Sequence, residues 1–110
     1  LPELTALDLL TYSHKFTISQ IATILHELAE KIKAGNLAKI ARQYRNTASI
    51  QRLGYILEAE LSQSKLADSL WKVLTQRNYS SIPLSAKKEK KGDADNRWKV
   101  IENIQIEDDL

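Results

Sequence analysis

Apolar residues recur along most of the chain at the spacing of an α-helix. The clearest stretch puts seven of them on one helical face: Ile18, Ile21, Ala22, Leu25, Leu28, Ala29 and Ile32. Thr17 followed by Gln20 fits a capping box at the start. Gly35 fits the left-handed residue that ends a helix. The pattern therefore predicts a helix of about four turns between Thr17 and Gly35.

Two shorter stretches on either side of this helix have the same period. The first covers residues 2–12, where Pro2 suits the first turn of a helix. The second extends from Asn36, a candidate N-cap, to Tyr44, with Leu37 and Ala41 on its apolar face. We expect a helix in each stretch.

Two further helices are predicted between Asn46 and Arg77. The first of them starts with a cap at Thr47 or Ser49 and carries Gly54 on its apolar face. A glycine at such a position often lets another backbone approach closely. The second starts at Ser62 or Ser64, and its apolar face contains Leu66, Leu70, Val73 and Leu74.

The helical period stops after Arg77. Residues 80–84 form a short extended run, which Pro83 confines to a sheet edge or to non-strand structure. Residues 85–96 are a charged, solvated loop for which disorder is one interpretation, and 97–106 alternate as a strand with a bend at 102–103. Two short strands make a poor independent sheet, so they pack on the helices or pair with strands outside this chain.

The predicted fold class is therefore mainly α. About five short-to-medium helices would pack as an irregular bundle with a short C-terminal β element. The acidic end, residues 107–109, is expected to be a solvated tail.

Length and composition limit the class of protein. A chain of 110 residues fits one domain, and 43% hydrophobic with 27% charged residues is close to a globular average. Without methionine, residues 1–110 are expected to be a single domain or a fragment of a longer protein. The apolar runs are too short for a membrane span, and the first residues lack the basic region of a signal peptide, so we expect a cytoplasmic location.

Catalytic and metal-binding motifs are missing from the sequence. The chain has no cysteine, and its two histidines, His14 and His26, have no clustered partners in the sequence. Phosphate-binding glycine loops and nucleophile motifs are also absent. We therefore predict no catalytic, cofactor-binding or metal-binding residue, and a protein that is not an enzyme.

Basic residues are concentrated between Lys31 and Leu57, a stretch without any acid. Lys39, Arg42 and Arg45 are spaced by three and so predict one basic side of a helix. This side could bind phosphate or an acidic protein surface. The alternative is a solvated face with structural ion pairs. Arg97 either lies on the surface or completes this basic site.

Two charges stand within otherwise apolar stretches. Asp8 lies in ALDLL and Arg52 in IQRLGYIL, and a partly buried charge needs a partner. We therefore predict an ion pair between them. Trp98, at the start of the last strand, is expected to pack in the core or against the sheet.

The order of several segments resembles one known family. The chain contains, in sequence, PELTALDLL, SIQRLGYILE, SIPLS, NRWKVIEN and IQIEDDL. This set resembles the C-terminal domain of AbiEi-family antitoxins, from type IV toxin–antitoxin systems that act in bacterial abortive infection. The matching positions are Ala6, Leu7, Asp8, Leu9, Arg52, Leu53, Gly54, Pro83, Leu84, Arg97 and Trp98.

The resemblance implies a function as well as a fold. Family members carry an N-terminal winged-helix DNA-binding domain, absent from these 110 residues, that represses transcription of the operon. The C-terminal domain counters a nucleotidyltransferase-like toxin. We therefore expect a non-enzymatic antitoxin module of an antiviral defence regulator, with the toxin or its target as partner. The alternative is a nucleic-acid-binding or oligomerisation domain that assists promoter repression.

Overall fold

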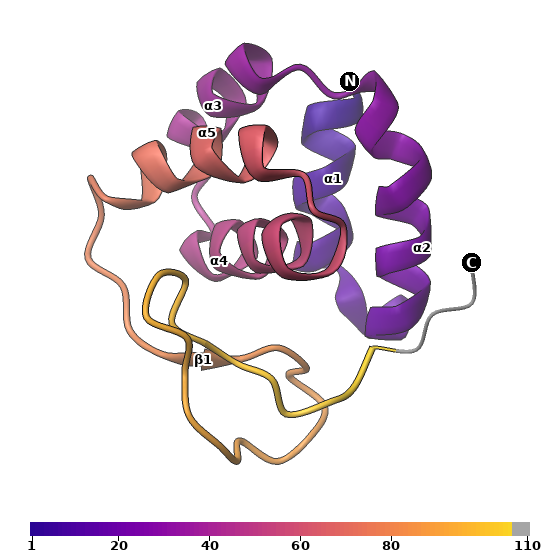
Figure 1. Cartoon of the computed structure of the whole chain (residues 1–110), viewed down its shortest axis with the longest axis vertical. Helices are drawn as coiled ribbons and strands as arrows, with labels where there is room; N and C mark the ends of the chain where they lie inside the picture. Colours follow the sequence, from indigo (N-terminus) through magenta and orange to yellow (C-terminus); the bar gives the residue numbers. More distant parts are fainter. Residues whose placement is uncertain (107–110) are drawn as a thin grey trace.

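Five α-helices form the body of the molecule, and the last segment of the chain packs below them (Figure 1). The computed structural model describes residues 1–106. The helices are α1 (Pro2–Thr11), α2 (Ile18–Leu28), α3 (Ala34–Gln43), α4 (Thr47–Tyr55) and α5 (Ser64–Leu74). The predicted fold class, mainly α with a short C-terminal β element, is confirmed.

The predicted capping box starts α2. Thr17 Oγ1 accepts the backbone N–H of Gln20, and Gln20 Oε1 accepts that of Thr17. The helix ends earlier than predicted, at Leu28, and a 3₁₀ turn, η2 (Ala29–Lys31), follows it. The chain then becomes extended at Ile32 rather than left-handed at Gly35.

Two predictions at the start of α3 were wrong. Gly35 does not end α2 and Asn36 is not an N-cap, since both lie within the first turn of α3. The reason is a contact from another helix. The Glu3 carboxylate accepts the backbone N–H of Lys33 at 3.0 Å, and Lys33 takes the extended conformation from which α3 begins.

The cap of α4 also differs from the prediction. Asn46 is the N-cap, because its Oδ1 accepts the N–H of Ser49 at 3.0 Å, so neither Thr47 nor Ser49 has this role. The helix continues into a π-helical turn, η3 (Ile56–Glu60). The start of α5 at Ser64 agrees with one of the two predicted positions.

The β element is a two-stranded parallel sheet. Its strands are β1 (Ile82–Pro83) and β2 (Val100–Ile101), with Ile82 opposite Val100. The strand predicted for 97–106 was therefore too long. Lys99 has a φ of 56°, and the Asp95 carboxylate accepts backbone N–H groups on both sides of it, which holds a turn there. The strands pair with each other, and β2 packs on α4.

The side chain of Asn103 organises the charged loop. Its Nδ2 donates to the carbonyl groups of Ser85, Lys88 and Glu89, and its Oδ1 accepts the N–H of Ser85 at 2.8 Å. Residues 86–93 are exposed. The predicted tail, 107–109, lies outside the described residues.

The hydrophobic core joins all five helices to the last segment. Helix α5 packs on α3 and α4, and α1 packs on α2, α3 and α4. Trp98, 1% exposed, is the largest fully buried side chain and confirms the predicted core position. In the described part of the chain, no helix is both long and apolar enough to span a membrane.

Candidate interaction surface

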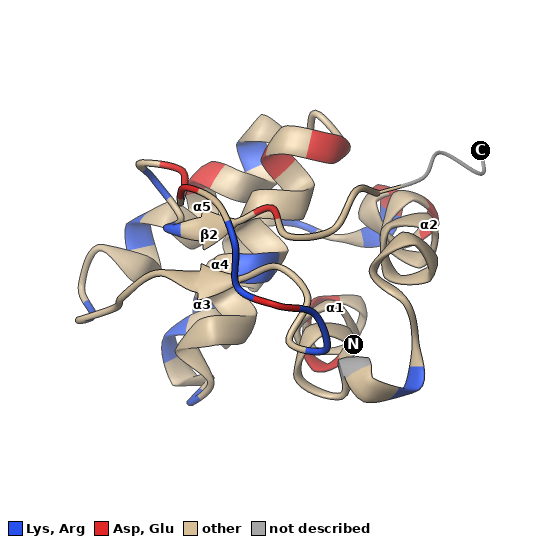
Figure 2. Ribbon diagram, turned by 90° about the horizontal axis from the view of Figure 1, so that it is seen from below, with Lys and Arg blue, Asp and Glu red and all other residues tan. Residues whose placement is uncertain are grey.

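Helix α3 presents basic residues and no acidic one (Figure 2). Lys39 and Arg42 are exposed on this helix, three residues apart and so on one side of it. Arg45 is exposed too, but α3 ends at Gln43, so Arg45 lies in the connection to α4. The expectation that all three share one helix was wrong. Within residues 1–106, none of the three side chains forms an ion pair.

Tyr44 sets the end of α3. The backbone of Tyr44 is extended, and its hydroxyl donates to the Asp8 carboxylate on α1 at 2.6 Å. The same hydroxyl contacts Thr11 Oγ1, which in turn bonds Ser49 Oγ at 2.8 Å. Burial and the hydrogen bond to Asp8 raise the pKa of Tyr44 to about 12. This network joins α1, α3 and α4 just before Arg45.

Arg77 satisfies the carbonyl groups at the end of α3. Its Nη2 donates to the carbonyl oxygens of Ala41 at 2.8 Å and Tyr44 at 2.6 Å, and its Nη1 donates to Thr47 Oγ1 at 3.1 Å. The last carbonyls of a helix lack intrahelical partners and carry partial negative charge, so a cation is favourable there. Arg77 thus ties the chain after α5 to α3.

A hollow of about 460 Å³ lies between α3 and α5. Its lining, called here the basic groove, consists of Arg42, Lys72, Val73, Gln76 and Arg77. The lining contains three cations and no carboxylate. The guanidinium of Arg77 is held on carbonyl oxygens, and among residues 1–106 it forms no ion pair. The groove can therefore accept an anionic group.

Lys72 and Arg77 were missed by the sequence reasoning. Lys72 lies in the last turn of α5, and Arg77 follows the end of that helix. Both residues come 27 or more positions after Arg45 in the sequence. No pattern within one helix joins them to Arg42. The only available signal was that cations occur near a helix C-terminus, which is common.

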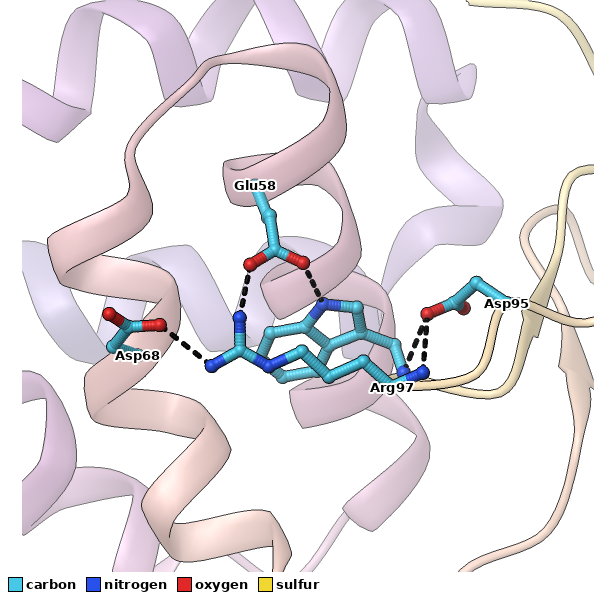
Figure 3. A network of polar contacts seen from close by, with 5 residues as sticks. Glu58, Asp68, Asp95 and Arg97 are labelled. Carbon is cyan, nitrogen blue, oxygen red and sulfur yellow. Dashed lines mark hydrogen bonds and ion pairs between the residues drawn. The ribbon is translucent and has the colours of Figure 1, made fainter.

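Arg97 does not belong to the basic groove. Its guanidinium forms ion pairs with Glu58 on η3 and, at 2.7 Å, with Asp68 on α5 (Figure 3). It also lies over the rings of Trp71 and Trp98, at 4.9 and 5.3 Å from the ring centres. We call this arrangement the arginine clamp. It fastens the last segment of the chain to η3 and α5.

Trp98 lies directly beneath the arginine clamp. Its Nε1 donates to Glu58 at 3.0 Å, and its ring meets that of Trp71 edge to face at 5.8 Å between centroids. A Cβ atom placed on Gly54 would overlap the Trp98 ring. A close approach at Gly54 is therefore present, but the prediction of an approaching backbone was wrong, because the Trp98 side chain fills the space.

The predicted ion pair between Asp8 and Arg52 was wrong. Asp8 is used by Tyr44, and Arg52 Nε donates to the carbonyl oxygen of Pro83 at 2.9 Å. Each charge thus has a polar partner of its own, which satisfies it without an ion pair. Burial lowers the pKa of Arg52. Arg52 joins α4 to β1, so its role is to hold the small sheet.

The described residues hold no group of three or more His, Cys, Asp and Glu side chains that could bind a metal ion. His14 and His26 are both exposed.

Glu60 and Glu102 lie close together. The pKa of Glu60 is raised, mainly by burial and then by the negative charge of the Glu102 carboxylate. Burial and the Glu102 carboxylate also raise the pKa of Tyr55, which donates to Glu102 at 3.1 Å.

The architecture and surface together define a small, mainly helical module with a basic groove free of carboxylates. The model of the family described as AbiEi antitoxin C-terminal domain matches residues 1–59, just over half of the chain. The chain therefore belongs to this family, and its role is that of an antitoxin in a toxin–antitoxin system. No curated protein and no solved structure matches the chain.

Proposed function

We propose that this chain opposes a nucleotidyltransferase-like toxin through the basic groove, without catalysis of its own. It would do so as the C-terminal antitoxin module of a cytoplasmic defence regulator whose winged-helix domain lies outside these residues. The observation that supports the proposal is the group of cations around the end of α3. Arg42 and Lys72 are exposed, and Arg77 is fixed beside them.

The charges of this surface suit a macromolecular partner. A single exposed ion pair contributes little, about 0–1 kcal/mol, whereas several cations acting together steer and orient an acidic partner. Lys39 and Arg45 extend the basic surface on either side of Arg42 along the chain. An arginine fork matches a carboxylate of the toxin or a phosphate of the toxin's target. Either contact would oppose the toxin.

Growth on co-expression with the toxin encoded next to the antitoxin gene tests this proposal. The variant Lys39→Glu, Arg42→Glu and Lys72→Glu reverses the two exposed cations of the basic groove together with Lys39 on the same side of α3. A control with the same net charge is Lys31→Glu, Lys33→Glu and Lys65→Glu, at exposed sites outside the groove. We expect the control to protect as the unchanged chain does and the first variant to fail, with equal helicity by circular dichroism. Equal protection by both variants contradicts the proposal.

A second candidate function rests on the same surface. Since no carboxylate lines the groove, nucleic-acid phosphates could bind there, and the domain would then assist promoter repression by a neighbouring DNA-binding domain. Salt dependence separates the two functions. Binding to promoter DNA through these cations would weaken steeply between about 50 and 200 mM salt. A salt-independent effect of this domain on repression would favour oligomerisation instead.

A further inference from the structure

A second cationic surface lies where the turn after α1 meets the charged loop. The turn is η1 (Ser13–Lys15), and Lys87 Nζ donates to the carbonyl oxygen of His14 at 2.9 Å. Two segments 73 residues apart in sequence are thereby held together. Neither segment contributes to the basic groove.

Aromatic side chains are exposed at this junction. Tyr12 is 56% exposed and Phe16 is 37% exposed, whereas the buried core is mostly aliphatic. Phe16 lines a groove of about 260 Å³ whose apolar wall continues through Ile18 and Ile104. Lys87 and Lys88 line the same groove. One exposed aromatic ring and two lysine side chains therefore line the same groove.

The charge of these two segments is net positive. The turn contributes one lysine, and the loop contributes four lysines and three acids: Lys15, then Lys87, Lys88, Lys90 and Lys91 with Glu89, Asp93 and Asp95. Glu89 is already paired with Lys91 at 3.4 Å. Asn103 donates to the carbonyl groups of Ser85, Lys88 and Glu89, which holds this part of the loop backbone in place.

We propose that this junction binds single-stranded nucleic acid, with a base against the Phe16 ring and the flanking phosphates at Lys87, Lys88 and Lys15. Alternating bases and phosphates require an exposed aromatic face between cations, and sequence-independent single-strand sites are built in this way. A duplex keeps its bases stacked inside and cannot use the ring. An acidic peptide would use the lysines alone.

Fluorescence anisotropy with a labelled oligouridylate of about 12 nucleotides tests the proposal on the purified chain. The variant Lys15→Glu and Lys88→Glu changes two exposed lysines whose side chains have no hydrogen bond in the described structure. Its matched control is Lys31→Glu and Lys65→Glu. Phe16→Leu keeps an apolar side chain in the groove but removes the aromatic face.

We expect about a tenfold or greater loss of affinity in the lysine variant and about a tenfold loss for Phe16→Leu. The control should stay within about threefold of the unchanged chain. Affinity should fall steeply between about 50 and 200 mM salt. These expected results do not depend on the function proposed for the basic groove, because Arg42 and Lys72 are unchanged in every variant.

Three results would overturn the proposal. One is the absence of oligouridylate binding at about 50 mM salt. Another is equal affinity for a duplex of the same length, which would show that phosphates alone are contacted. The third is equal affinity for polyglutamate together with no effect of Phe16→Leu, which would make the junction a site for acidic peptides.

Discussion

The indole ring of Trp98 occupies the space into which a side chain on Gly54 would project. Both residues are fully buried, and they come from α4 and from the segment before β2. Glycine is thus required at position 54 by packing and not by backbone conformation, since Gly54 has no positive φ. The centre of the fold depends on this contact.

Gly54→Ala should destabilise the protein by about 3 kcal/mol, because the added methyl group cannot be accommodated without moving the Trp98 ring. Gly35→Ala is the matched control, since nothing lies within 4 Å of a Cβ atom there. In a helix this control should stabilise by about 0.5–1 kcal/mol. Urea unfolding measures both free energies. A Gly54→Ala protein as stable as the unchanged chain would contradict the packing argument.

Arg77→Gln should lower the free energy of unfolding by about 2 kcal/mol, because charged hydrogen bonds to carbonyls at the end of α3 are lost. Arg42→Gln removes an exposed cation of the same groove and should change stability by less than about 0.5 kcal/mol. Thermal unfolding followed by circular dichroism makes this comparison. Equal losses in both variants would show that Arg77 acts only through its charge.

Alkaline pH should weaken the fold partly through Tyr44. The folded protein holds the phenol proton more tightly than the unfolded chain, because the pKa of Tyr44 rises from 10.0 to about 12. Its stabilising contribution is therefore complete below pH 10.0 and is lost as the pH rises through about 12. The difference in unfolding free energy between the unchanged chain and Tyr44→Phe should shrink across this interval. A constant difference would contradict the prediction.

The arginine clamp should show measurable coupling between Arg97 and Asp68. A double-mutant cycle with Arg97→Gln and Asp68→Asn isolates their interaction, and we expect about 0.5–1 kcal/mol because both groups are partly exposed. Glutamine removes both the charge and the fork that reaches Glu58 and Asp68 together. Near-ultraviolet circular dichroism should also change as the Trp71–Trp98 pair loses its cation. A coupling energy of zero would show that the contact between Arg97 and Asp68 contributes nothing to stability.

The helices were predictable because their apolar period is local. The faces around Leu25, Leu53 and Leu70 are buried as predicted, and the capping box of α2 is formed by neighbours in sequence. Caps that depend on another helix were not predictable. Glu3, some 30 residues from Lys33, decides where α3 begins.

The candidate surface was predictable only in part. Lys39 and Arg42 follow from spacing on one helix, but Arg77 reaches the same place from beyond α5 through carbonyl contacts that leave no sequence pattern. Arg97 was included in the candidate surface because of its charge alone, whereas in the structure it forms ion pairs with Glu58 and Asp68. The partners of Asp8 and Arg52 were also not predictable. A hydroxyl group and a backbone carbonyl satisfy these two charges, so neither needs an oppositely charged side chain.

The boundary of the family match, at residue 59, does not coincide with the boundary of a folding unit. Arg77 finishes α3 and Trp98 covers Gly54, yet both belong to the part of the chain that follows the match. A chain cut near residue 60 would expose an unfilled face on α4 and leave α3 frayed. The matched region is thus packed as one unit with the residues that follow it, so substitutions after residue 59 would alter the packing of the matched part.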